Sequence, residues 1–238
     1  MPQNKAFEAS PKDTASEMTE EMCLVVNETD VVLGSQSKLV CHYKEGIRHR
    51  AFSVLLFDLN GRLLVQRRSR KKVTFPQVWA NTCCGHPLDI VSENTNSAVS
   101  GVIAAACRKL NQELGITPKI IADWEFHHIG KIDYFCRWDM NWSEREIDHV
   151  LVVQGEVDII TPNTDEISEV RWLTPYGLRR MMNSEAEWSK DIIAPWFKLI
   201  WRHFINPANG DVHVMANTNK PEILSYEDIT KMLSSEVD

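Results

Sequence analysis

The 238-residue sequence has no apolar run long enough to span a bilayer, and residues 1–21 are polar and acidic rather than basic and then apolar. We therefore expect no membrane anchor and no secretory signal. The six cysteines form no CxxC pair, which argues against a structural zinc ribbon, and without a secretory signal we expect free thiols. These absences predict a cytoplasmic protein.

Positive charge is also scarce. The chain has 26 Lys and Arg against 33 Asp and Glu, and this acidic balance argues against a general nucleic-acid binder. There is no internal repeat, and an apolar content of 43% lets a chain of this length bury one full core. We expect residues 1–21 to form a disordered or loosely held leader, and residues 22–238 to form a single domain with a C-terminal helical extension.

The patterning of apolar residues predicts several strands. Two hairpins are expected, one turning at 27–30 and a more secure one turning at Asn60-Gly61, which is a strong turn signal. Residues 35–50, between the hairpins, look irregular. The expected strands span 22–26, 31–33, 51–57, 62–67, 124–135, 147–154 and 167–173.

The best helix runs over 97–114, where apolar residues recur at three- and four-residue spacing and Gly115 follows at the end. This mixture of elements predicts an α+β domain rather than a regular parallel βαβ array. Further helices are expected at 174–182, at 195–205 and, as a short last element, after 225.

The stretch Thr82-Cys83-Cys84-Gly85-His86-Pro87 combines a thiol and an imidazole around a glycine. In an extended backbone, Cys84 and His86 point to the same face, and Gly85 allows a close approach to the main chain. These residues suit a proton donor beside a metal ligand. The alternative is a turn with a reduced cysteine and a surface histidine.

The run Arg67-Arg68-Ser69-Arg70-Lys71-Lys72 follows the second hairpin. It is interpreted as a solvated strand end, as a nucleic-acid contact, which the acidic chain disfavours, or as a phosphate-binding lip beside Cys84.

Three of the eight histidines, His42, His49 and His86, lie in segments otherwise poor in expected regular structure, and Glu144 and Glu146 share one face of a strand. Together they would suit a divalent metal such as Mn²⁺ or Zn²⁺, or Mg²⁺ where carboxylates dominate. Spacing alone does not bring them together, and a lone histidine is more often an ordinary surface or core residue.

Glu113, at the end of the long helix, is interpreted either as a solvated residue of the last turn or as a ligand of a second hard cation held by a phosphorylated substrate.

Several motifs follow one another along the chain, namely Lys38-Leu39-Val40-Cys41-His42, His49-Arg50-Ala51-Phe52-Ser53, Asn81-Thr82-Cys83-Cys84-Gly85-His86-Pro87, Glu113-Leu114-Gly115, Glu144-Arg145-Glu146-Ile147-Asp148 and Pro195-Trp196-Phe197. In these motifs and their order, residues 22–204 resemble type I isopentenyl-diphosphate isomerase, a family of the Nudix fold superfamily. The resemblance implies a Nudix-like mixed sheet sandwiched by helices, and interconversion of isopentenyl and dimethylallyl diphosphate by protonation and deprotonation in isoprenoid biosynthesis.

The resemblance also implies roles for individual residues. One divalent metal (Mg²⁺, Mn²⁺ or Zn²⁺) would be held by the histidine and glutamate set, and a second, Mg²⁺, would bind the diphosphate with help from Glu113. Cys84 and Glu146 would be the two acid/base groups, with Tyr134 beside Glu146. The metal set is His42, His49, His86, Glu144 and Glu146, and the diphosphate would be held by Lys38, Arg68, Lys72 and Lys109.

The residue chemistry agrees with these roles. An alkene is a very weak base, so its protonation needs a positioned acid in a dry pocket and a partner for the tertiary cation. A thiol is the acid, Glu146 the opposing base, and the indole of Trp196 the cation partner. Two positions depart from the family: Lys109 stands where an arginine is usual, with Arg108 as an alternative, and Gln77 stands where glycine is frequent.

Two rival functions remain at this stage. A Nudix hydrolase would gather several carboxylates on its helix to activate water, whereas residues 108–115 contain only one acid. A catalytically inactive binding module would not require Cys84, His86 and Glu146 together. We expect a small-molecule diphosphate as the partner, with no nucleic acid and no membrane, and a monomer.

Overall fold

The computed structural model describes residues 18–157, 160–184, 191–208, 215 and 223–224. At the centre of its sheet lies β3 (His49–Phe57), a strand whose nine residues are all buried. It pairs in parallel with β8 (Ser143–Gln154), from His49 opposite Glu146 to Phe57 opposite Gln154. A strand covered on both faces needs a nearly continuous apolar run, which 51–57 provides.

The main path of the sheet follows the order β10-β7-β8-β3-β1-β2. The first predicted hairpin is confirmed: β1 (Met22–Val26) pairs antiparallel with β2 (Val32–Ser37). Residues 35–50 are only partly irregular as expected. Ser37 caps a short helix, α2 (Lys38–His42), by accepting a hydrogen bond from the Val40 amide, whereas residues 43–48 form no helix or strand. The other strands of this path are β7 (Phe126–Arg137) and β10 (Ile223–Leu224).

The second hairpin is only partly as predicted. Its turn forms, with the Asp58 amide donating to Arg62 and Gly61 at φ +71°. However, β3 and β4 (Leu63–Arg68) pair only at Phe57 and Leu63, and β4 then pairs with β5 (Trp79–Ala80) and β9 (Ile167–Leu173). The strands diverge because the same edge of β3 is already taken by β1 and by β6 (Cys83–Gly85).

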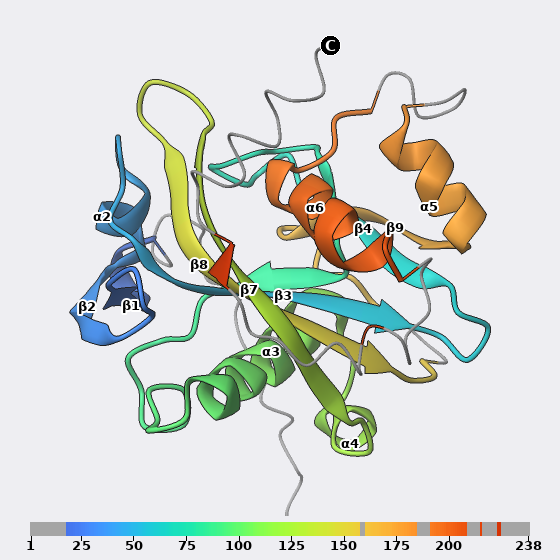
Figure 1. Cartoon of the computed structure of the whole chain (residues 1–238), viewed down its shortest axis with the longest axis horizontal. Helices are drawn as coiled ribbons and strands as arrows, with labels where there is room; N and C mark the ends of the chain where they lie inside the picture. The colour runs from blue at the N-terminus through green and yellow to red at the C-terminus, as the bar shows by residue number, and fades with distance from the viewer. Residues whose placement is uncertain (1–17, 158–159, 185–190, 209–214, 216–222, 225–238) are drawn as a thin grey trace, which may run out of the picture.

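Helices cover both faces of the sheet (Figure 1). On one face lies α3 (Ala98–Leu114), capped by Ser97 and ended by the left-handed Gly115 as predicted, with α4 (Pro118–Ile121) after it. On the other lie α5 (Pro175–Met182) and α6 (Pro195–Ile200). Each face has its own buried cluster, so the mixed sheet between helices is confirmed.

Two expected helices need comment. The helix expected over 195–205 changes at Trp201, where α6 passes into the π-helical segment η2 (Trp201–Ile205). The helix expected after 225 lies outside the described residues.

The last residues of the expected leader, 18–21, pack against the domain. Met18 is buried and Glu21 forms an ion pair with Lys38, so residues 18–21 are held by the domain, while residues 1–17 lie outside the described part of the chain. Among the described residues, no helix combines the length and apolar character that crossing a bilayer requires.

Candidate active site

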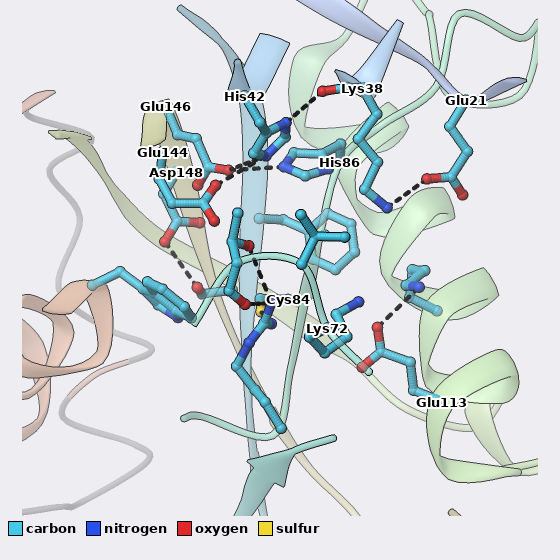
Figure 2. A pocket seen from close by; sticks show the side chains of 18 of the residues that line it. Glu21, Lys38, His42, Lys72, Cys84, His86, Glu113, Glu144, Glu146 and Asp148 are labelled. Atoms are coloured by element: carbon cyan, nitrogen blue, oxygen red, sulfur yellow. Dashed lines mark hydrogen bonds and ion pairs between the residues drawn. The ribbon is translucent and has the colours of Figure 1, made fainter. Parts of the chain in front are cut away.

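One cavity collects every candidate site residue except His49, which lies directly behind its wall. The cavity lies where β3, β6 and β8 meet α2 and α3, and Trp196 of α6 also lines it. Figure 2 shows Cys84 between two groups of side chains: imidazoles and carboxylates at one end, lysines and further carboxylates at the other. The predicted residues that line it are Lys38, His42, Arg68, Lys72, Cys84, His86, Lys109, Glu113, Tyr134, Glu144, Glu146 and Trp196.

At the first end, His42, His49, His86 and Glu146 each direct one ligand atom into a space where these atoms lie within 4.8 Å of one another. They come from α2, β3, the residue after β6, and β8. The parallel register that sets His49 opposite Glu146 explains how residues so distant in sequence meet. Glu144 lies beside them, with Oε2 2.9 Å from Nε2 of His42.

This donor set fits a divalent metal ion. Nδ1 of His42 donates to the Lys38 carbonyl and Nδ1 of His49 to the Ile47 carbonyl, each at 2.7 Å, because a carbonyl can only accept. Each ring therefore turns Nε2 toward the cluster, which is how metal-binding histidines are oriented. Nε2 of His49 is buried without a hydrogen-bond partner, so a cation would satisfy it.

The two acid/base candidates have opposite charge states. Burial raises the pKa of the Cys84 thiol to about 12, against the opposing effect of Arg68, so the thiol keeps its proton at neutral pH. Burial alone would also raise the pKa of Glu146, but the imidazoles of His49 and His86, whose Nε2 atoms lie 3.4 Å and 2.8 Å from its Oε1, hold that pKa well below its usual range. A protonated thiol and an ionised carboxylate therefore face one cavity, which is the pairing that proton donation and abstraction require.

Tyr134 and Trp196 complete the wall near the reacting groups. The Tyr134 hydroxyl donates to Oε2 of Glu146 at 2.5 Å, and burial raises its pKa well above the usual value. The Trp196 indole donates to Oδ1 of Asn81 at 3.1 Å, and the Arg68 guanidinium lies 5.5 Å from its ring centroid. The indole is thus fixed, and one cation already lies over it.

At the second end, the lysines predicted to bind diphosphate lie close together. Nζ of Lys38 lies 2.8 Å from Glu21, and Nζ of Lys72 lies 2.6 Å from Glu166. Lys109 lies 3.0 Å from Glu113 and 3.5 Å from Glu166.

The other residues of this region have defined partners. Glu113 also accepts hydrogen bonds from Gln66 and from Cys83, so it is not a solvated residue of the last turn. Cys83 packs in the buried cluster that includes residues of α3, whereas Cys84 packs against the cluster on the other face of the sheet. Arg108, the alternative to Lys109, pairs with Glu93 and donates to the His86 carbonyl, which braces the β6 end.

Gln77 has φ +61°, the left-handed conformation that glycine adopts most easily. This explains why a glycine suits the position. Here the side chain contributes a hydrogen bond from Nε2 to the Arg68 carbonyl at 3.0 Å.

Three acidic residues at or beside the cavity were missed from sequence: Glu21, Asp148 and Glu166. Asp148 follows Glu144 and Glu146 at the same two-residue spacing on β8, so extending that alternation would have found it. Its pKa is raised well above the usual range by burial, and Ser53 donates to it. Nothing in the local sequence marks Glu21 or Glu166, because their partners lie far along the chain.

Comparison with known proteins adds independent information. Residues 47–197 match the family model of the NUDIX domain. Isopentenyl-diphosphate delta-isomerase of Schizosaccharomyces pombe is 42% identical over 196 residues, covering 79% of this chain and 83% of the relative. The chloroplastic isopentenyl-diphosphate delta-isomerase II of Arabidopsis thaliana is 40% identical, with 79% and 68% covered.

Solved structures support the fold. A protein from Deinococcus radiodurans superposes with a TM-score of 0.54 at 20% identity, covering 76% of this chain and 98% of that one. A Nudix hydrolase from Alicyclobacillus acidocaldarius gives a TM-score of 0.51 at 11% identity, with 73% and 96% covered.

Proposed function

The chain belongs to the isopentenyl-diphosphate delta-isomerase family of Nudix-domain proteins, and from this premise we propose how its pocket works. The enzyme interconverts isopentenyl and dimethylallyl diphosphate in isoprenoid biosynthesis. One observation supports this chemistry most: a protonated Cys84 and an ionised Glu146 line the same cavity as Lys38, Lys72 and Lys109.

Cys84 donates a proton to the terminal carbon of the isopentenyl double bond, which leaves a tertiary carbocation. Glu146 removes a proton from the carbon next to the diphosphate-bearing carbon, and the new double bond forms there. Because Tyr134 donates to Oε2 of Glu146, it orients this carboxylate and stabilises its charge. In the reverse direction the two groups exchange tasks.

The cavity excludes water and stabilises the cation. Burial of Cys84 prevents it from ionising to a thiolate, which could not donate a proton. The indole of Trp196 offers a π face to the developing positive charge, and the hydrogen bond to Asn81 fixes the plane of the ring. Diphosphate bound by Lys38, Arg68, Lys72 and Lys109 fixes the C5 skeleton from a point remote from the reacting carbons.

The histidine cluster suits one divalent ion held by His42, His49, His86, Glu144 and Glu146. The mixture of imidazole and carboxylate favours Mn²⁺ or Zn²⁺, with Mg²⁺ suited where carboxylates dominate. When bound, such an ion supplies a fixed positive charge that holds the ligand side chains in place. Glu113 would help to hold a second ion, Mg²⁺, that accompanies the diphosphate.

A hydrolase is the alternative activity within the superfamily. Residues 108–115, the last turns of α3 and its C-cap, contain Glu113 as their only acid. That arrangement disfavours a cluster of carboxylates that activates water.

Incubation with isopentenyl diphosphate, followed by proton NMR, tests the isomerase activity, and the same protein with nucleoside diphosphates and Mg²⁺ tests the alternative. We expect dimethylallyl signals and no phosphate release. Phosphate release at enzymatic rates without isomerisation would assign a hydrolase, and neither product would assign a binding module.

We further propose that the enzyme acts as a cytosolic monomer on a small-molecule substrate.

A further inference from the structure

Each lysine predicted to bind diphosphate already has a carboxylate partner. Lys38 pairs with Glu21, Lys72 with Glu166, and Lys109 with both Glu113 and Glu166. Figure 2 shows the pairing of Glu21 with Lys38, which lies beside His42 and His86. These side chains are largely buried, so water screens their interactions little.

Glu166 is the member that contacts two lysines. It immediately precedes β9, and its own carbonyl accepts from the Ser69 amide at 2.9 Å, which ties it to the segment that carries Lys72. It does not line the cavity but lies behind Lys72 and Lys109. Its place therefore suits holding both ammonium groups toward a ligand rather than touching the ligand itself.

The carboxylates reduce the positive charge available to an anion. The pKa of Glu21 is lowered to about 2: burial would raise it, but Lys38 and Lys109 lower it more. Burial would also raise the pKa of Glu166, but Lys72 and Lys109 lower it more. Both are ionised at neutral pH.

Four cations, Lys38, Arg68, Lys72 and Lys109, thus face three acids, Glu21, Glu113 and Glu166. Together these seven side chains carry about one net positive charge.

A diphosphate ester brings about three negative charges near neutral pH. Without further compensation, it would leave excess negative charge in a buried site, which is costly. A divalent cation bound to the diphosphate would neutralise this excess negative charge. If the acids were absent, the four cations alone would more than balance the three negative charges of a free diphosphate, and no divalent cation would be needed.

We propose that Glu166 positions Lys72 and Lys109 and that, with Glu21, it makes the pocket select a diphosphate complexed with a divalent cation over the free anion. This rests on the proposed function, because it takes the lysine end as the diphosphate site. Glu166 acts through the lysines and is a positioning residue, whereas Glu21 lines the cavity and faces the ligand.

The chain contains a matched control. Next to the buried pair of Lys72 and Glu166 lies a second pair, Lys71 and Asp165, with the same chemistry and a distance of 2.5 Å. Lys71 is 63% exposed in its side chain against 15% for Lys72. Asp165→Asn therefore removes the same charge one residue away but outside the pocket.

The test is calorimetric titration of the full chain with inorganic pyrophosphate, with and without Mg²⁺, and the measured quantity is the ratio of the two dissociation constants. Wild type binds the Mg²⁺ complex more tightly. Glu166→Gln and Glu21→Gln lower this preference by about tenfold, the scale expected for one charge at short range in a partly screened site. Asp165→Asn keeps the wild-type ratio, and so does Glu166→Asp, since it retains the charge.

A Glu166→Gln ratio equal to that of wild type overturns the inference, as does an equal fall in Glu166→Asp. If Glu166→Gln does not fold, Glu21→Gln decides alone, because it removes a carboxylate from a different element. Isomerisation assays on the same wild-type protein separate the two claims: absence of product refutes the proposed function, and unchanged ratios with normal product refute only the role of the acids.

Discussion

Replacing Trp196 by phenylalanine and by leucine isolates the contribution of its π face. Both variants lose the indole N–H, so both leave Oδ1 of Asn81 buried without its donor, at a cost of about 1–3 kcal/mol of unfolding free energy. Because this loss is common to the two variants, a difference in kcat between them reports on the ring. Phenylalanine keeps a weaker π face, and leucine has none.

The expected size follows from the site. A desolvated cation–π contact is worth about 2 kcal/mol, and at about 1.4 kcal/mol per tenfold in rate its loss lowers kcat about 30-fold. We expect kcat to fall in the order Trp196, Phe, Leu.

The structure adds an effect on KM, because the Arg68 guanidinium lies over the same ring, 5.5 Å from its centroid. Leucine removes that support, so its KM for isopentenyl diphosphate should rise about fivefold, in keeping with a contact of about 1 kcal/mol.

Steady-state kinetics on isopentenyl diphosphate and thermal unfolding of the three proteins provide the assay. If the phenylalanine and leucine variants have equal kcat while both melt far below wild type, Trp196 is a packing residue and the cation argument is wrong.

Other predictions concern the neighbouring groups. Cys84→Ala should abolish isomerisation with unchanged far-UV circular dichroism, whereas Cys83→Ala, on the opposite side of β6, should retain most of it; equal activities would exclude the thiol as the acid. Chelation of divalent ions should abolish activity and lower the melting temperature. The affinity for a divalent ion should rise with pH up to about 9, because Glu146 raises the pKa of His49 to about 9 against the effect of burial and a proton on His49 competes with the metal. An affinity independent of pH would contradict this. Gln77→Val should unfold more easily than Gln77→Gly in urea, because a β-branched residue resists φ +61°; the reverse order would remove the strain argument. Asp30 forms a buried ion pair with Arg50, whose Nε lies 2.7 Å from Oδ1 of Asp30. Asp30→Asn removes the negative charge from this pair and should cost about 3 kcal/mol of unfolding free energy. A loss below 1 kcal/mol in urea unfolding would contradict this value.

Local signals predicted what depends on local energetics. The long helix was predicted within one residue because its N-cap, its apolar periodicity and its C-terminal glycine all lie within the segment. The turn at Asn60-Gly61 was predicted for the same reason. The two strands beside it were also predicted, but their pairing was not, because the partner of β4 depends on which strands already occupy the edge of β3, and distant segments decide this.

The site divides in a similar way. Cys84, His86 and the glutamates of β8 were found because a two-residue spacing places side chains on one face of a strand. His42 and His49 were joined to them by resemblance, and the structure brings them together through the parallel register of β3 and β8. Glu21 and Glu166 were out of reach, because an ion pair between distant segments has no sequence pattern.

The most direct measurement of the central claim is the reaction of isopentenyl diphosphate in deuterium oxide, followed by proton and deuterium NMR. If Cys84 and Glu146 exchange protons with the substrate through one cavity, wild type should place deuterium in a methyl group of dimethylallyl diphosphate, and Cys84→Ala should give no product. Product formed without deuterium, or formed by Cys84→Ala at the wild-type rate, would contradict the proposed mechanism.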